Sequence, residues 1–453
     1  MKKYIGDRDF YRRLFTVMIP VLIQNVITNF VSLLDNIMVG RVGTEPMSGV
    51  AIVNQLIFVF NLCIFGGLSG AGIFTAQYYG KGDDEGVRAT MRFKGWIALA
   101  ASTVALGLFA FFGENLISLF IHEGEDNLDL AATMFYAKQY LAIMMIQLPL
   151  FAFLNIYTST LRETGNTRLP MTAGVIAVMV NLIGNYLLIY GKFGAPRLGV
   201  QGAAIATVVA RVVEVVISVA GSKFHGVWKT MRVPVELSKK IAVKGLPLLA
   251  NELLWSSGMT TLNQIMSIRG LEVVSAENIC STVSNLFFCS FFAMGTTISI
   301  IIGQHLGAGD FDAAVDDERK LISFAVVLCV AVGAVMALIA PLFPRIYNTT
   351  DIVKSLAAKM IIINAIMMPS NAFTNSCYFT LRSGGRVWIT MLFDSIYLWV
   401  LAIPVTLALV KLTALPIVPV YAISYGIDII KCVFGFILVR SGIWINNLVN
   451  EDL

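Results

Sequence analysis

The chain has 453 residues, of which 57% are hydrophobic and only 13% are charged, and its formal net charge is +5 at pH 7. Soluble proteins carry about 25% charged residues, so this composition excludes a soluble globular protein and is typical of a polytopic membrane protein. The basic residues lie in loops between apolar runs, and we therefore predict no nucleic-acid partner.

Apolar runs long enough to cross a bilayer follow one another along the whole chain. Because lipid offers no hydrogen-bond partner to an unpaired backbone group, each run is expected to cross as a helix. The predicted fold is all-α and integral to the membrane, with twelve transmembrane helices. They are expected over residues 14–38, 50–79, 93–113, 130–158, 169–190, 200–221, 240–267, 276–305, 320–343, 352–380, 387–410 and 415–439.

Lys and Arg gather in the loops on the side of the membrane that holds the N-terminus. The positive-inside rule then places both termini in the cytoplasm and the acidic loop 122–129 outside. The charged start 1–13 leads into an apolar stretch that is too long for a signal-peptide core, so we expect an uncleaved first span. The predicted location is a bacterial cytoplasmic (inner) membrane.

Two motifs recur in the second half of the chain. AQYYGKGD at 76–83 matches GQHLGAGD at 303–310, and LRETG at 161–165 matches LRSGG at 381–385. Six spans per repeat is an even number, so both repeats have the same orientation and are related by a pseudo-two-fold axis along the membrane normal. We expect a six-helix bundle over 14–222, a basic cytoplasmic linker over 223–239 and a second six-helix bundle over 240–440. Such a duplication favours a transporter that rocks one bundle against the other.

Several kinds of site are not predicted. All six cysteines fall inside apolar runs and none belongs to a CxxC motif, so neither a disulfide framework nor a zinc site is expected. The chain has no GxxxxGK[ST] loop for ATP. The acidic motifs DDEG at 83–86 and DDER at 316–319 are interpreted as solvated helix starts.

Three acidic residues inside predicted spans are candidates for ion coupling, because a charge within the bilayer costs about 2.5–3.5 kcal/mol on insertion scales. Glu252 lies about 12 Å into its span at 1.5 Å per residue. The alternatives are a structural hydrogen bond for Glu252, a place at the outer interface for Asp35, and an interhelical hydrogen bond for Asp394. A carboxylate that faces a cleft can bind a cation and exchange it for a proton or Na⁺.

Two further pairs of charges are spaced i,i+3 within predicted spans. They are Arg211 with Glu214, and Asp428 with Lys431. At this spacing each pair can neutralise itself on one helix face, so both are interpreted as structural.

The motifs PVLIQNV, LLDNIMVG, AQYYGKGD, LRETGNTRLPM and NELLWSSGM, in this order, resemble those of the multidrug and toxic compound extrusion (MATE) family from Leu14 to Arg440. The resemblance implies a two-lobed fold of twelve helices that exports organic cations in exchange for H⁺ or Na⁺. It matches Asp35 to the acidic residue of the first helix and Glu252 to the seventh-helix glutamate of the NorM-like branch.

The chain departs from the family's patterns at two places. Asn371 stands where the NorM-like branch has an aspartate, and Asn181 and Asn185 stand where the archaeal-type branch has one. We therefore hypothesise that Asp394 replaces a missing carboxylate. The expected cavity lining consists of polar, aromatic and Met side chains, which suit flat hydrophobic cations. These candidates are Asn25, Asn181, Asn185, Asn251, Trp255, Ser256, Asn285, Phe288, Phe291, Met294 and Asn371.

The sequence thus predicts a monomeric secondary exporter of small organic cations or amphipathic drugs, with no cofactor beyond the coupling ion. That ion is H⁺ or Na⁺, and a Na⁺ site near Glu252 would draw on oxygens such as those of Asn251, Ser256 and Asn285. A flippase for a lipid-linked precursor is the first alternative, and Lys138 and Lys359 are the cations that would serve it. An intramembrane transferase is the second, but it needs clustered catalytic carboxylates that the sequence does not present.

Overall fold

The computed structural model describes residues 4–120 and 129–450, and in this part of the chain every regular element is helical. The first half contains α1 (Arg8–Gly40), α2 (Thr44–Lys81), α3 (Asp84–Ser118), α4 (Leu130–Glu163), α5 (Arg168–Tyr190), α6 (Val200–Ala220) and a short 3₁₀ turn at Val227–Lys229. The second half contains α7 (Val235–Ser267), α8 (Leu271–Ala308), α9 (Phe311–Ile339), a 3₁₀ turn at Phe343–Ile346, α10 (Asp351–Ser383), α11 (Val387–Met391), α12 (Ile403–Leu412), α13 (Ile417–Gly426) and α14 (Asp428–Arg440).

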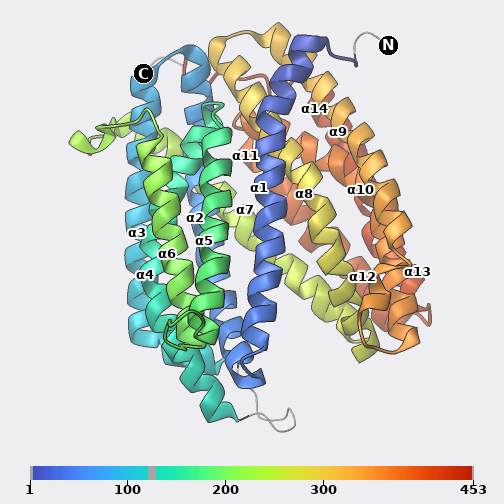
Figure 1. Cartoon of the computed structure of the whole chain (residues 1–453). Helices are drawn as coiled ribbons and strands as arrows, with labels where there is room; N and C mark the ends of the chain where they lie inside the picture. The colour runs from blue at the N-terminus through green and yellow to red at the C-terminus, as the bar shows by residue number, and fades with distance from the viewer. Residues whose placement is uncertain (1–3, 121–128, 451–453) are drawn as a thin grey trace. The chain divides into compact units, whose positions relative to one another are not determined.

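These elements form twelve long helical segments, because α11 continues into α12 and α13 into α14 (Figure 1). The predicted all-α fold of twelve helices is therefore confirmed. Eleven of the described segments are long and apolar enough to cross a membrane. The twelfth is α7, which is as long as α1 but whose apolar stretch is interrupted by Lys244 and Glu252.

The helices extend beyond the predicted spans because polar residues cap and continue them. Asp129 caps α4 by accepting hydrogen bonds from the backbone N–H groups of Ala131 and Ala132. Thr350 caps α10 in the same way, through the N–H of Val353. A prediction based on apolar runs alone therefore misses polar first turns, such as those of α3 and α9, which begin at Asp84 and Phe311.

One segment departs from α-helical geometry. Between α11 and α12 the chain forms two π-helical turns, at Leu392–Ile396 and Leu398–Ala402. The first of these turns contains Asp394, which the sequence analysis selected. A π turn inserts an extra residue into a helix and is frequent at functional sites, because it re-aims the side chains that follow.

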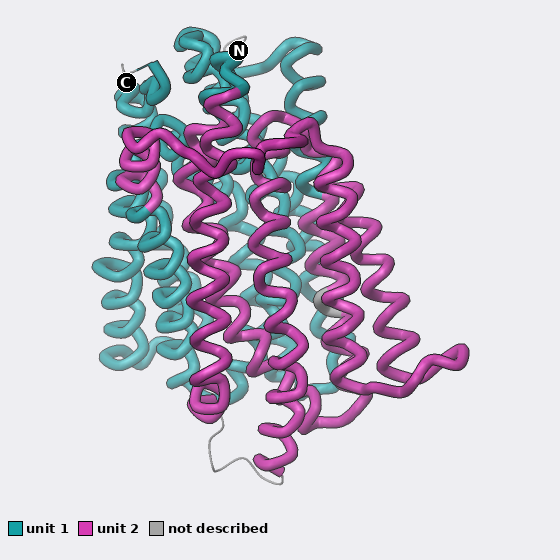
Figure 2. The backbone as a smooth tube through the Cα atoms, turned by 90° about the vertical axis from the view of Figure 1, so that its left-hand side faces the viewer, with its two compact units in different colours: residues 1–22, 76–84, 246–453 teal, residues 23–75, 85–245 magenta. Residues whose placement is uncertain are grey.

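The chain divides into two compact units (Figure 2). Unit 1 comprises residues 1–22, 76–84 and 246–453, and unit 2 comprises 23–75 and 85–245. Helices α1, α2 and α7 each contribute to both units. In α1 and α7 the change of unit falls beside Pro20 and Pro247, which lie at equivalent positions of the repeat, and a proline inside a helix removes one backbone hydrogen bond. The division into bundles at 14–222 and 240–440 stays a prediction.

The internal repeat is visible in unit 1 as a reciprocal helix crossing. Gly80 at the end of α2 lies against the backbone carbonyl of Gln304, and Gly307 at the end of α8 lies against that of Gln77. A Cβ atom at either glycine would overlap the carbonyl oxygen of the other helix. The two matched motifs thus meet each other through a close backbone approach that only glycine permits.

Both ends of the described chain belong to the same end of unit 1. Trp444, after α14, is buried in one cluster with Phe10 and Leu14 of α1. The segment 443–449 also hydrogen-bonds the ends of α2 and α8, through Gln77 and Gly307. A chain whose two ends lie at the same end of a unit crosses the membrane an even number of times, in agreement with the prediction.

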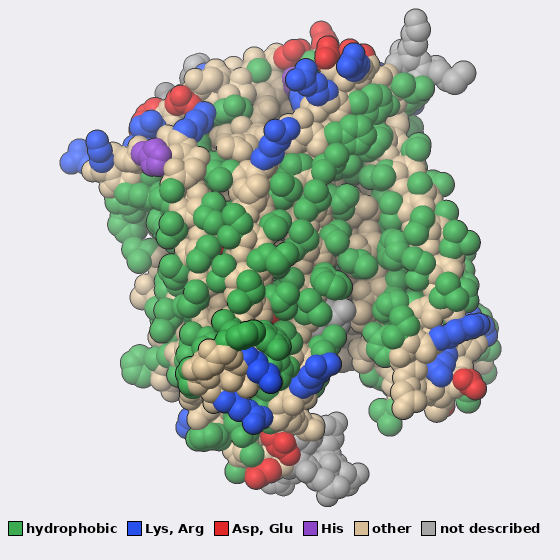
Figure 3. Space-filling view, viewed as in Figure 1, with side chains coloured by type: hydrophobic (Ala, Val, Ile, Leu, Met, Phe, Trp, Pro, Cys, Tyr) green, Lys and Arg blue, Asp and Glu red, His purple; other side chains and the backbone are tan. Residues whose placement is uncertain are grey.

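The surface follows the pattern expected for a membrane protein. Hydrophobic side chains cover the middle of the helices on the face drawn in Figure 3, and Lys, Arg, Asp and Glu gather toward the helix ends. Exposed apolar residues such as Phe111, Val330 and Val433 lie within helices of spanning length. Because lipid solvates such side chains, their exposure fits a bilayer environment.

Candidate functional site in two buried polar clusters

In unit 2, Asp35 belongs to a chain of hydrogen bonds that connects three helices. The Asn185 amide on α5 donates to the Asp35 carboxylate on α1 at 2.6 Å and to the Asn181 carbonyl at 3.2 Å. Asn181 in turn donates to the Thr207 hydroxyl on α6 at 3.2 Å. The structure thus brings together three residues that the sequence analysis selected separately.

The partners of Asp35 indicate how far its side chain lies from the surface of unit 2. Its side chain is half-buried, and its partner Asn185 is only 1% exposed. Tyr140 on α4, whose hydroxyl donates to Asn54 at 3.3 Å, is close enough to Asp35 to interact with its charge. Asp35 therefore lies within the packed polar interior of unit 2, which disfavours the alternative of a carboxylate exposed at the outer interface.

In unit 1, two carboxylates lie beside two cations from other helices. The Glu252 carboxylate on α7 is 3.9 Å from the Arg382 guanidinium on α10. The Asp394 carboxylate is 3.2 Å from the Lys431 ammonium on α14. All four side chains are largely buried, so a low-dielectric surrounding strengthens both ion pairs.

Asn251 connects these two ion pairs. Its amide N–H group donates to the Tyr378 hydroxyl at 3.2 Å and to Asp394 at 3.3 Å. Its amide oxygen accepts from the Ser395 hydroxyl at 2.6 Å, from the π-helical turn. Asn251 precedes Glu252 on α7, so the same helix turn presents the coupling candidate and the residue that links it to Asp394.

The charges of this cluster do not balance. Asp428, at the start of α14, interacts electrostatically with both Lys431 and Asp394. Three carboxylates, those of Glu252, Asp394 and Asp428, therefore face the two cations Arg382 and Lys431, which leaves a surplus of one negative charge when all are ionised. Lys431 thus interacts with Asp428 on its own helix, as the i,i+3 spacing predicts, and in addition hydrogen-bonds Asp394.

Unit 2 also contains cations inside the helical bundle, but their partners differ from those in unit 1. Arg162, the repeat equivalent of Arg382, donates to Gln24 at 2.7 Å, where unit 1 has Glu252 beside its arginine. Arg211 pairs with Glu214 at 2.6 Å, which confirms the predicted i,i+3 pair. On α3, Lys94 is fully buried and pairs with Glu163 of α4 at 2.5 Å.

Sequence reasoning missed these cations as interior residues. Lys94, Arg162 and Arg382 stand at the ends of apolar runs, so they were assigned to the cytoplasmic ends of spans. Arg162 and Arg382 do lie in the last turns of α4 and α10, but Lys94 and Arg382 are buried, so the buried charges are not mostly acidic. The recurrence of Arg162 and Arg382 in the two LR motifs was the available signal.

The remaining lining candidates are dispersed. Phe291 and Met294 are buried in hydrophobic core clusters, and Phe288 stacks on Phe291 with ring centroids 5.0 Å apart. Asn285 is exposed on α8. The other four are half-buried on α1, α7 or α10, and they are Asn25, Trp255, Ser256 and Asn371.

One of the oxygens proposed for a Na⁺ site is engaged elsewhere, because the side-chain oxygen of Asn251 accepts from Ser395. Within residues 4–120 and 129–450, no group of three or more His, Cys, Asp and Glu side chains is arranged to hold a metal ion. A Na⁺ site at Glu252 stays a prediction that would require Asn251 to rearrange.

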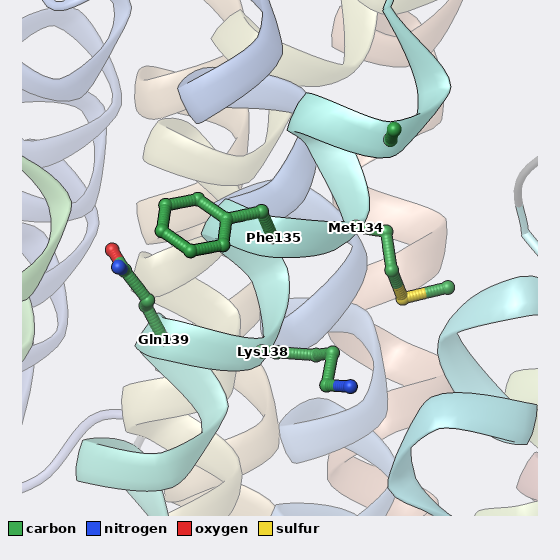
Figure 4. A pocket seen from close by; sticks show the side chains of 5 residues that line it. Met134, Phe135, Lys138 and Gln139 are labelled. Atoms are coloured by element: carbon green, nitrogen blue, oxygen red, sulfur yellow. The ribbon is translucent and has the colours of Figure 1, made fainter.

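The two lysines that the flippase alternative invokes lie at the surface. Lys138 is about half-exposed and pairs with Glu114 at 2.7 Å. Figure 4 shows it beside Met134, Phe135 and Gln139 in a hollow whose described lining residues all belong to α4. Lys359 is exposed on α10, in a surface cleft at the opposite end of unit 1 from Trp444.

A duplicated helical membrane protein with ionisable residues in its interior has the organisation of a secondary transporter. The chain belongs to the MatE family, whose profile matches residues 20–187 and 247–407. It is therefore a multi-pass membrane transporter and not an enzyme, as the sequence predicted.

Relatives and solved structures agree with this assignment. The chain is 24% identical to the probable multidrug resistance protein NorM of Thermotoga maritima, over 96% of this chain and 93% of that protein. It is 25% identical to the multidrug resistance protein PmpM of Pseudomonas aeruginosa, over 87% and 83%.

Two solved structures share the fold. One is the Vibrio cholerae MATE transporter VcmN in the bent form, with a TM-score of 0.84 and 16% identity over 96% of this chain and 97% of that one. The other is an outward-facing multidrug resistance MATE family transporter, with a TM-score of 0.83 and 18% identity over 97% and 98%.

Proposed function

We propose that this transporter exports organic cations in exchange for H⁺ or Na⁺ across a bacterial cytoplasmic membrane, with both termini inside. The multidrug resistance functions named for its relatives support the substrate class. The basic loops support the orientation. Glu252, Asp394 and Asp35 carry the exchange, and Glu252 has the leading role.

The surplus negative charge of the unit 1 cluster is the observation that carries this proposal. An uncompensated charge in a low-dielectric interior is costly, so the cluster favours the uptake of one monovalent cation. A proton, a Na⁺ ion or the ammonium group of a substrate can each remove the surplus. One monovalent cation is enough to neutralise the cluster, so the proton, Na⁺ and the substrate compete for it. Because of this competition, binding of one ion releases another, which is the basis of exchange.

Glu252 is the best site for that competition. Its distance of 3.9 Å to Arg382 exceeds hydrogen-bond length, so the pair holds the carboxylate less tightly than a bidentate contact would. Asp394 is already hydrogen-bonded by Asn251 and Lys431. The arriving cation therefore displaces the weaker contact, at Glu252.

Alternating access completes the proposed cycle. The two repeats rock against each other, and the paired prolines in α1 and α7 supply places where these helices can bend. Asp35, with its amide chain through Asn185 and Asn181, acts as a second protonation site in unit 2.

The lipid-precursor flippase is less well supported. An anionic pyrophosphate would need cations whose charge is available to it. The buried cations of the described chain lie beside acids or amides, as Lys94 does with Glu163 and Arg382 with Glu252.

The test is uptake of a fluorescent organic cation into proteoliposomes under an imposed pH gradient or an imposed Na⁺ gradient. Wild-type protein is expected to respond to one of the two gradients, and Glu252→Gln to neither. Glu272→Gln, the same change at an exposed position, is the matched control and should behave as wild type. If neither gradient drives uptake by wild-type protein, the exchange proposal fails and the flippase becomes the better account.

A further inference from the structure

A second polar cleft lies in unit 1, apart from the Glu252 cluster. It has a volume of about 500 Å³, within the range of small-molecule sites. Its walls come from the first turns of α9, from α10 and from the end of α14, and the segment 442–445 covers part of it. These helices lie on the right of Figure 1, and the cleft is at the end of unit 1 that holds both chain termini.

Glu318 provides a carboxylate within this cleft. The three successive acidic residues of α9 have different surroundings. Asp316 pairs with Lys320, and Asp317 pairs with Arg13 and His305. Glu318 is only 6% exposed and lines the cleft, and among the described residues it forms no direct ion pair, although the charge of the neighbouring Arg319 acts on it. The expectation that the DDER motif is solvated is therefore wrong for Asp317 and Glu318.

Two arginines stand at the mouth of the cleft. Arg319 and Arg440 are both exposed and both line it. Arg440 also lies over the ring of Phe436, 5.8 Å from its centroid. The cleft thus presents a negative charge inside and positive charges at its entrance. The two arginines at the entrance repel a simple cation, and the Glu318 carboxylate inside repels a simple anion. A zwitterion can pair its positive group with Glu318 and its negative group with the arginines.

The walls are aromatic and open toward the apolar surface. Phe373, Phe436 and Trp444 line the cleft, and aromatic faces favour an ammonium group. Phe436 is 52% exposed, and Val433 and Ile437 beside it on α14 are exposed as well. A ligand whose polar end sits in the cleft can therefore lay an apolar tail along α14.

We propose that this cleft binds the zwitterionic headgroup of a phosphatidylethanolamine-type lipid. Its primary ammonium donates hydrogen bonds to the Glu318 carboxylate, and its phosphate accepts them from Arg319 and Arg440. Its acyl chains follow the exposed apolar side chains of α14. The proposal does not depend on the identity of the exported substrate or on the coupling ion, because none of these groups belongs to the Glu252 cluster.

The experiment measures lipid binding to the purified full-length protein by native mass spectrometry. The probes are short-chain phosphatidylethanolamine, phosphatidylcholine and phosphatidylglycerol. Wild-type protein is expected to prefer phosphatidylethanolamine, and Glu318→Gln to lose that preference by about tenfold, the scale of one charge-assisted hydrogen bond. Arg440→Gln, at an exposed position, is expected to weaken the binding of all three lipids. Glu272→Gln should leave all affinities unchanged.

Several results would overturn the proposal. They are equal binding of the three lipids by wild-type protein, or an unchanged preference in Glu318→Gln with a normal melting temperature. Displacement of the lipid by glycerophosphoethanolamine at equal affinity would indicate a site for a soluble zwitterion instead. Displacement by tetraphenylphosphonium in wild type but not in Glu318→Gln would indicate a site for organic cations.

Discussion

The Lys94–Glu163 ion pair of unit 2 is expected to act as a structural connection between α3 and α4. Lys94 is fully buried, and its ammonium donates to the Glu163 carboxylate at 2.5 Å, to Ser159 at 2.9 Å and to Thr160 at 3.2 Å. All three of its N–H groups are thus satisfied by α4. The perturbation we choose is Lys94→Met, which keeps most of the volume and removes the charge.

The expected loss follows from what the substitution leaves behind. Glu163 keeps a largely buried carboxylate that has lost its ammonium partner and retains the more distant charge of Arg162, and breaking a buried ion pair in this way costs up to about 3–5 kcal/mol. Lys94→Met/Glu163→Gln removes both charges of the pair. That double variant is expected to recover most of the loss, because replacing a whole buried pair by neutral groups is often nearly neutral.

The assay is unfolding of detergent-solubilised protein, followed for wild type, both single variants and the double variant as a double-mutant cycle. Lys239→Met is the control, because Lys239 and its partner Glu236 are both exposed and such pairs contribute about 1 kcal/mol or less. If Lys94→Met costs no more than the control, or the two single effects simply add, the pair does not stabilise unit 2 and the reasoning fails.

Three further predictions concern the two clusters and the repeat. Asn185→Leu removes the hydrogen-bond donor to Asp35 and is expected to reduce gradient-driven uptake without lowering expression; unchanged uptake would assign the amide chain to packing alone. Asp394→Asn is expected to lower uptake and thermal stability together, because it removes the carboxylate that buried Lys431 hydrogen-bonds and leaves this lysine with Asp428 alone. Unchanged uptake with a lowered melting temperature would make Asp394 structural. Gly307→Ala places a methyl group against a backbone carbonyl of α2 and should lower the melting temperature, whereas an unchanged melting curve would contradict the close crossing.

The helices and their repeat could be predicted from the sequence because lipid permits few alternatives. An apolar run of spanning length crosses as a helix, and matched motifs around Gly80 and Gly307 mark equivalent positions in the two repeats. The structure adds that these glycines cross each other within unit 1. The similarity of the two motifs predicts that they occupy equivalent positions in the repeats, but it does not predict that they contact each other.

The pairing of charges could not be predicted in the same way. Whether Lys431 reaches Asp428 on its own helix or Asp394 on another depends on helix rotation, and the π turn at Leu392–Ile396 changes that rotation locally. Arg382 was placed at the end of a span because a charge ends an apolar run. The sequence therefore identified Glu252 but missed its cationic partner, which decides how the carboxylate is held.

Glu318 illustrates the same difficulty at a helix start. A run of acidic residues at the beginning of a helix is usually solvated, and its composition gave no reason to separate Glu318 from its neighbours. Burial by α10, α14 and the segment after α14 distinguishes it, and these are contacts between distant parts of the chain.

The central claim is that a substrate cation and a coupling ion compete for one negative charge at Glu252. Its most direct test is the affinity of purified protein for a fluorescent organic cation, measured across a range of pH and of Na⁺ concentration. We predict that wild-type and Glu272→Gln protein bind the dye less tightly as one of the two ions increases, and that Glu252→Gln loses this dependence. Dye binding that neither ion weakens in wild-type protein, or a dependence that persists in Glu252→Gln, would contradict the account.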